Sequence, residues 1–162
     1  MMKQLKMIRL TIFVLISGIA FSFIILGCNK EEFNSDADFQ LTFSNDTVIF
    51  DTIFTSIGTA SQVLMVYNNS DLPVKISSIR LAGGSASPYR VNIDGDAVFQ
   101  KSDVEIASKD SLYIFVKVTI DPGNTDLPLI RTDSVIFETN GNRQDVKLVA
   151  WGQNAYFYNN EV

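Results

Sequence analysis

The chain contains no histidine and a single cysteine, Cys28, among its 162 residues. The lack of histidine excludes His-based catalytic triads, Cys-His dyads and the usual zinc ligand sets. If Cys28 is covalently modified, no thiol is left for a disulfide, a redox centre or a soft-metal site. We therefore expect a protein that is stabilised by apolar packing, that holds no cofactor and that is not an enzyme.

Basic residues are scarce in the part of the chain that follows residue 27. That part holds all 18 acidic residues and only ten of the 13 basic ones, so its formal charge is −8. A field of this sign repels nucleic acid and anionic lipid, and we expect no nucleic-acid partner. The remaining 135 residues fit one domain with a core of ordinary size.

The first 28 residues have the organisation of an export signal. Three basic residues precede an uncharged run over residues 10–27, which ends directly at Cys28. This pattern resembles a bacterial lipoprotein signal peptide, which forms a helix. The resemblance implies that residues 1–27 are removed after Gly27, and that Cys28 carries fatty acyl chains such as palmitate and becomes the mature N-terminus. We then expect a protein that is attached to a membrane by this lipid anchor and whose protein or glycan partner is unknown.

Two other interpretations of this stretch stay open. Residues 10–27 are just long enough to span a bilayer as an uncleaved helix, and an ordinary cleaved signal has a similar outline. The only cysteine of the chain stands where the lipoprotein motif requires it, which favours the lipoprotein.

The next segment, residues 28–39, is polar and acidic, so we predict a flexible tether. Lys30, Glu31 and Glu32 follow Cys28 closely. They resemble the lysine-then-acidic signal that sends some lipoproteins of the Bacteroidota to the outer face of the outer membrane. A solvated charged linker explains the same residues equally well. The expected location is the outer membrane of the cell envelope, with its periplasmic and external faces as alternatives.

Beyond the tether, apolar and polar residues alternate in short runs that are separated by turn residues. This period of two is typical of half-buried strands. The predicted strands are Gln40–Phe43, Thr47–Phe54, Gln62–Tyr67, Val74–Ala82, Tyr89–Ile93, Asp103–Ile106, Ser111–Ile120, Asp133–Thr139 and Gln144–Ala150. Asn140-Gly141, between two of them, predicts a type I′ hairpin turn. So many short strands predict an all-β immunoglobulin-like antiparallel β-sandwich over residues 40–152.

Period two also assigns the faces of the strands. The predicted inward side chains are Leu112, Ile114, Val116, Val118, Ile120, Val135, Phe137, Val146, Leu148 and Ala150. Tyr113 and Phe115 fall on the outer face, where they are either covered by a loop or form an exposed aromatic patch.

Residues 45–152 resemble the Hydin-type (ASH) and major-sperm-protein-like immunoglobulin domains. The resemblance is carried by residues 48–54, 57–59, 63–68, 74–79, 110–122 and 146–152, in that order. These motifs are structural, so they imply the fold and transfer no catalytic residue. Asn68, Pro122 and Gly152 can be understood without the family, as residues that begin turns or end strands.

Carboxylates offer the remaining candidates for chemistry. Asn92, Asp94 and Asp96 alternate in a spacing that suits calcium, but the twelfth position is Asp103 instead of a bidentate glutamate. A solvated turn is the better interpretation, and Asp121, Asp126 and Asp133 give an equally weak signal. The Ser85–Ser87 segment beside two glycines is interpreted as a loop.

Aromatic residues gather near the C-terminus, at Trp151, Tyr156, Phe157 and Tyr158. We expect Trp151, Tyr156 and Tyr158 either to contact a ligand or to belong to an interface with a further domain, because residues 153–162 are a tail or the beginning of one. Three functions follow. The first is a non-enzymatic lipid-anchored spacer, adhesion or scaffold module. The alternatives are a carbohydrate-binding module of a surface glycan-uptake system and a hydrolase that uses carboxylates alone.

Overall fold

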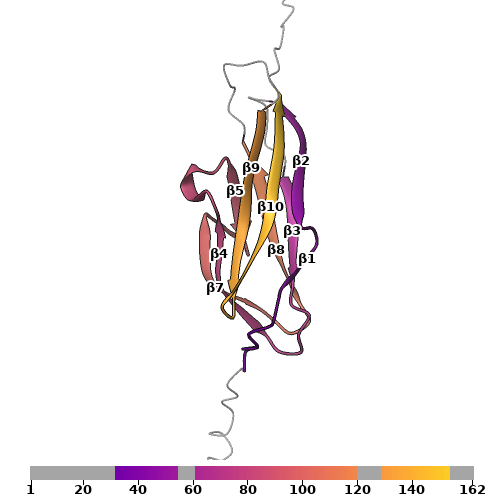
Figure 1. Ribbon diagram of the computed structural model, residues 1–162, viewed down its shortest axis with the longest axis vertical. Helices are drawn as coiled ribbons and strands as arrows, with labels where there is room; N and C mark the ends of the chain where they lie inside the picture. The colour runs from indigo at the N-terminus through magenta and orange to yellow at the C-terminus, as the bar shows by residue number, and fades with distance from the viewer. Residues whose placement is uncertain (1–31, 55–60, 120–128, 154–162) are drawn as a thin grey trace, which may run out of the picture. The chain divides into compact units, whose positions relative to one another are not determined.

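The computed structural model describes residues 32–54, 61–119 and 129–153, which fold into two five-stranded sheets (Figure 1). Sheet A has the order β1 (Thr42–Phe43), β3 (Ser61–Tyr67), β8 (Ser111–Val118), β5 (Tyr89–Ile93) and β6 (Asp96–Val98). Sheet B has the order β2 (Thr47–Phe54), β10 (Asn142–Gln153), β9 (Leu129–Thr139), β4 (Val74–Leu81) and β7 (Gln100–Ile106). The prediction of an all-β sandwich of two packed sheets is confirmed, but the predicted antiparallel arrangement is wrong for one pair of strands, β2 and β10.

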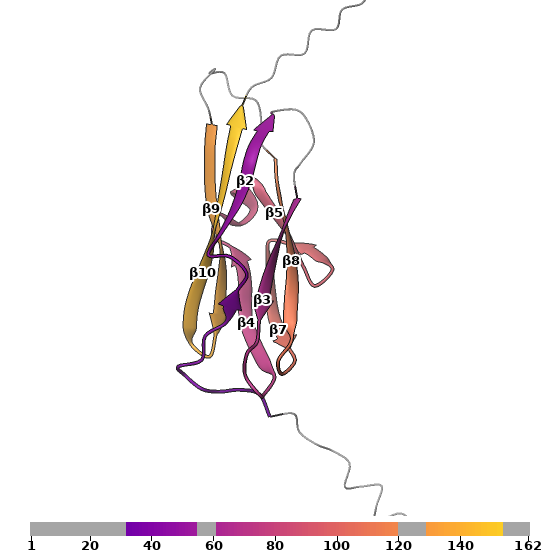
Figure 2. The ribbon, with the colours of Figure 1, turned by 90° about the vertical axis from the view of Figure 1, so that its right-hand side faces the viewer.

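Pairing is antiparallel except between β2 and β10, which run parallel from the pair Thr47 and Lys147 onward. The chain reaches this arrangement by crossing from sheet A at β1 to sheet B at β2. Figure 2 shows β2 and β3 on the same side of the sandwich, where the crossing occurs. The crossing leaves β1 only two residues long.

The core lies between the sheets and follows the predicted alternation. In β8, Leu112, Ile114, Val116 and Val118 are buried while the residues between them are exposed. The other predicted inward side chains that the structure describes are buried as well, namely Val135, Phe137, Val146, Leu148 and Ala150. Ile120 lies outside the described residues. The aromatic rings of Phe50 and Tyr89 join the two layers, with centroids 5.8 Å apart.

Two hairpin turns have the backbone that type I′ requires. Asn140 and Gly141 have φ values of 50° and 83°, so the predicted turn is confirmed. Asp94 and Gly95 have φ values of 52° and 84° and join β5 to β6 in the same way. β6 was not predicted, because its three residues are too few to show an alternation. β7, β9 and β10 also begin earlier than their apolar pattern suggested.

The segment before β1 differs from the predicted tether, because amide side chains of the β9–β10 hairpin hold it. The Nδ2 of Asn140 donates to the carbonyl oxygens of Asn34 and Asp36, both at 3.0 Å. Further along, Gln144 exchanges two hydrogen bonds with the backbone of Leu41, at 2.8 and 2.9 Å. The folded unit therefore begins at Glu32, and the expectation of a flexible tether is corrected for residues 34–39. The predicted signal, residues 1–27, lies outside the described residues.

The two ends of the described unit lie far apart. In Figure 1 the chain enters near the β9–β10 hairpin and leaves at the opposite end of the sandwich, where β10 ends at Gln153. No stretch among the described residues forms a helix with the length and apolarity needed to span a membrane.

Candidate functional site

The outer surface of sheet A carries a group of exposed and half-buried side chains, which we call the aromatic face: the exposed Val63, Tyr113 and Phe115 and the half-buried Met65 and Tyr67. Val63 is paired with Phe115, and Met65 with Tyr113, across β3 and β8. Tyr113 is 50% exposed and Phe115 46%, so among the described residues no loop covers them. Of the two alternatives for these residues, the exposed aromatic patch is the correct one.

The sequence did not reveal the β3 half of this face. Residues 63–67 form an unbroken apolar run, which is typical of a strand buried on both sides. Only the pairing with β8 shows that alternate members point outward. In the sequence, only the alternation of apolar and polar residues along β8 pointed to this face, because it placed Tyr113 and Phe115 on the outer side of the strand.

Two cations lie at one end of the aromatic face. Lys117 of β8 is exposed and is paired with both Ser61 of β3 and Arg90 of β5. The guanidinium of Arg90 donates to the carbonyl oxygens of Ser87 and Tyr89, at 2.6 and 2.7 Å, and lies 4.9 Å from the ring centroid of Phe99. Arg90 is therefore held in place. Lys117 has no ion-pair partner within 4.0 Å among the described residues.

Trp151 lies on the outer surface of sheet B and is 37% exposed. It is paired with Ile130, which is 59% exposed. The predicted companions Tyr156 and Tyr158 lie outside the described residues, so the structure does not bring the three aromatic residues together.

A cavity of about 660 Å³ lies beside Ile130, between the short 3₁₀ helix η1 (Gly84–Ala86), the ends of β5 and β8, and β9. Its walls carry hydrogen-bonding side chains, among them Ser85, Ser87, Thr119, Arg131 and Thr132. Ser85–Ser87, predicted as a loop, thus contains one turn of 3₁₀ helix.

Tyr89, at the start of β5, is fully buried. Its hydroxyl donates to the carbonyl oxygen of Arg131 at 2.8 Å. Burial, with a smaller contribution from the charge of Asp133, raises the pKa of Tyr89 from 10.0 to about 12. The folded state therefore holds this hydroxyl protonated at pH values where the unfolded chain ionises.

We expect the free energy of unfolding to fall between pH 10 and pH 12 because of Tyr89. A group whose pKa is raised by folding contributes its stabilisation fully below the unfolded pKa and loses it as the pH passes the folded one. At about 1.4 kcal/mol per pKa unit, the loss is roughly 2–3 kcal/mol. Tyr89→Phe should lack this part of the pH dependence in urea titrations, while lysine ionisation affects both proteins alike. Equal slopes for the two proteins between pH 10 and pH 12 would contradict the prediction.

In the alternating group Asn92, Asp94 and Asp96, the two aspartates pair with a lysine. The Nζ of Lys101 lies 3.3 Å from an oxygen of Asp94 and 2.8 Å from one of Asp96, and Asn92 donates to the carbonyl of Gly95 at 2.9 Å. The lysine cation thus occupies the place where the spacing suggested a metal. Among the described residues no group of three or more His, Cys, Asp or Glu side chains is arranged for a metal ion. Asp121 and Asp126 lie outside the described residues.

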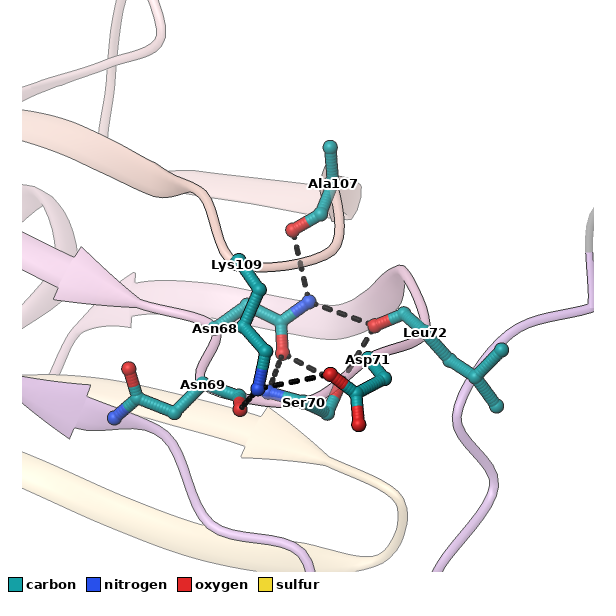
Figure 3. Close-up of polar contacts among 7 residues, drawn as sticks. All are labelled: Asn68, Asn69, Ser70, Asp71, Leu72, Ala107 and Lys109. Atoms are coloured by element: carbon teal, nitrogen blue, oxygen red, sulfur yellow. Dashed lines mark hydrogen bonds and ion pairs between the residues drawn. The ribbon is translucent and has the colours of Figure 1, made fainter.

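Asn68 is at the centre of a polar cluster at the turn after β3 (Figure 3). Its Nδ2 donates to the carbonyl oxygens of Leu72, Ile106 and Ala107, at 2.9, 3.2 and 2.9 Å. Its Oδ1 accepts from the backbone N–H and the hydroxyl of Ser70, at 3.0 and 2.7 Å. The side chain is buried, and it closes the turn as predicted. Nearby, Lys109 pairs with Asp71 at 3.0 Å.

The predicted lipidation and export residues lie at the edge of the described chain. Gly27, Cys28, Lys30 and Glu31 fall outside the described residues, while Glu32 is exposed at their boundary.

No protein-family model and no curated protein matches the chain. Several solved structures are similar to part of the chain. A family 123 glycoside hydrolase from Clostridium perfringens aligns at 8% identity and a TM-score of 0.48, over 72% of this chain and 27% of its own. The CooA pilin subunit from enterotoxigenic Escherichia coli aligns at 10% identity and 0.46, over 72% and 99%. The Escherichia coli chaperone DraB aligns at 14% identity and 0.44, over 69% and 54%. The chain thus spans about a quarter of the hydrolase and half of the chaperone, and these likenesses concern the fold alone.

Proposed function

We propose that the protein is a non-enzymatic lipoprotein of the cell envelope, in which the sandwich serves as a spacer or scaffold module. The observation that carries the proposal is the basic, then apolar, signal-like stretch that ends at the only cysteine, Cys28. Cleavage before Cys28 and its acylation would attach the module to a membrane. We place it at the outer membrane because Lys30, Glu31 and Glu32 resemble an outer-surface signal.

The geometry of the folded unit supports the role of a spacer. The unit begins at Glu32, a few residues after Cys28, so the anchored end would be the end that carries the β9–β10 hairpin. Sheets A and B then extend away from that end toward Gln153 (Figure 1). Surfaces near the far end, including Trp151, would be presented away from the membrane.

The side chains with catalytic potential support the absence of an enzymatic role. The chain has no histidine. The carboxylates of Asp94 and Asp96 are paired with Lys101, and Asp133 uses its Oδ1 to accept the backbone N–H groups of Gly83 and Ser134. Asp94, Asp96 and the Oδ1 of Asp133 are thus engaged in local structure, while the Oδ2 of Asp133 is buried without a hydrogen-bond partner among the described residues.

Intact-mass analysis of the protein purified from its native membrane tests the proposal. We expect a mass that lacks residues 1–27 and exceeds the remaining polypeptide by the mass of the fatty acyl groups on Cys28. A protein that begins at Met1 with a free thiol would contradict the proposal and favour an uncleaved helix. A cleaved chain without added mass would favour an ordinary signal peptide.

A further inference from the structure

Three of the four outermost strands of the sandwich carry features that discourage another strand from pairing with them. β7 has Lys101, Asp103 and Glu105, and Asp103 adopts a positive φ of 55° that distorts the strand. β6 is only three residues long and begins with Asp96. β2 has the exposed Asp51 at its centre. Charges, irregular backbone and short length are the usual protections of a sheet edge.

The edge of β3 lacks such protection over Ser61–Leu64. β1 pairs with β3 only at Tyr67 and Val66. Ser44 then binds Met65, donating its N–H to the carbonyl oxygen at 3.0 Å and accepting the Met65 N–H through Oγ at 3.1 Å. Beyond Ser44 the chain crosses to sheet B. Among the described residues, no strand pairs with Ser61–Leu64 on this side, and the four residues carry no charge.

The backbone of this segment points toward the open side at alternate residues. Because Ser44 binds the N–H and the C=O of Met65, both groups of Met65 face the β1 side. Backbone direction alternates along an antiparallel strand, so the corresponding groups of Val63 and Ser61 face the same side. Val63 and Ser61 together offer two N–H and two C=O groups, in line with the two groups of Met65 that Ser44 already binds.

We propose that Ser61–Leu64 of β3 bind an extended segment of a partner protein, which adds to sheet A antiparallel to β3 and continues the line of β1. Main-chain hydrogen bonds would hold such a segment, and side-chain pockets would select it. This edge would give the proposed scaffold a specific kind of partner. The proposal depends on the proposed function only for the place in the cell where the partner binds.

The side chains beside the edge define the chemistry of the partner segment. Val63, which is 44% exposed, and Phe115 next to it would contact an apolar side chain opposite Val63. Two residues further along the partner, the side chain opposite Ser61 would lie near Lys117, which has no ion-pair partner among the described residues. The partner segment should therefore consist mainly of β-branched residues, with an apolar side chain opposite Val63. It should carry a carboxylate two residues later, toward its C-terminal end.

The test uses the full-length mature protein in detergent micelles and a synthetic peptide of sequence Thr-Val-Thr-Glu-Thr, whose valine and glutamate would lie opposite Val63 and Ser61. We expect binding by fluorescence anisotropy together with slowed amide hydrogen exchange at Ser61 and Val63. Val63→Pro removes the N–H on the open side and should weaken binding about tenfold. Val63→Lys, which places a charge on the edge, is a second variant that retains the backbone N–H. Tyr113→Ala alters the aromatic face away from the edge and should leave binding within about twofold.

A peptide that is N-methylated at alternate amides distinguishes main-chain pairing from apolar adhesion, and it should not bind. No binding up to about 1 mM overturns the proposal. So does binding by Val63→Pro and Val63→Lys that is as strong as binding by the natural protein. So does a dimer that forms without peptide and is lost in Val63→Lys, because the occupant is then a second copy. Glycan binding that requires Tyr113 and Phe115, with no peptide binding, overturns it in favour of a sugar platform. Intact mass reports on the lipid anchor independently, so either proposal can fail alone.

Discussion

Replacing Cys28 by serine is expected to abolish acylation completely and to leave a precursor that still carries residues 1–27. In the lipoprotein class that this stretch resembles, the acylated cysteine is also the residue before which the signal is cut, so one substitution blocks both steps. Each buried methylene contributes about 0.8 kcal/mol to membrane attachment, and two acyl chains suffice for stable anchoring. Labelling of cells with tagged palmitate and the intact mass of the product measure the effect.

A matched variant shows whether the anchor is the lipid. When residues 1–28 are replaced by an ordinary cleaved secretion signal, the folded unit from Glu32 onward is unchanged, and the protein should move to the soluble fraction. If it stays in the membrane fraction after a high-salt wash, another part of the chain is responsible. If Cys28→Ser and the natural protein have the same mass apart from the substitution, an uncleaved helix is the anchor.

Replacing Asn68 by aspartate is expected to lower the free energy of unfolding by about 3 kcal/mol or more. The Nδ2 donates to three carbonyl oxygens, and the substitution sets a carboxylate oxygen against all three. The site is buried, so water cannot compensate for this repulsion. Urea titration should show a lower midpoint with an unchanged slope.

Asn69→Asp is the control, because it makes the same chemical change one residue later. Asn69 is exposed, and its Nδ2 makes one hydrogen bond, to Thr42 Oγ1 at 2.9 Å. Its effect should stay within about 1 kcal/mol. The loss at Asn68 should also shrink in acid, where the introduced group is protonated and can donate one hydrogen bond. A loss at Asn68 no larger than at Asn69 would show that the turn does not depend on this side chain.

Local pattern predicted most strands and their faces, because those depend on neighbouring residues. The alternation over Ser111–Val118 requires only that one face of a pleated strand be apolar. The turn at Asn140-Gly141 depends on two residues that tolerate positive φ. Where the pattern was too short, as at Asp96–Val98, the strand was missed.

The polar candidates were predicted less well, because side-chain partners come from distant parts of the chain. The spacing of Asp94 and Asp96 suggested a cation, and the cation that the fold supplies is Lys101 from the next strand. The acidic segment before β1 suggested a tether, yet Asn140 and Gln144, more than 100 positions away, hold it against the domain.

The amino-acid sequence by itself determined the class of fold, the inward faces of the strands and the expectation of a lipid anchor at Cys28, since each follows from residue type and short-range order. Only the tertiary structure decided which strands are neighbours and therefore which edge is left open. Strand pairing is settled by the packing of the whole core over long sequence separations. For that reason the unprotected edge at Ser61–Leu64 and the exposure of Val63 beside Phe115 could be recognised only after β1 was seen to leave sheet A at Ser44.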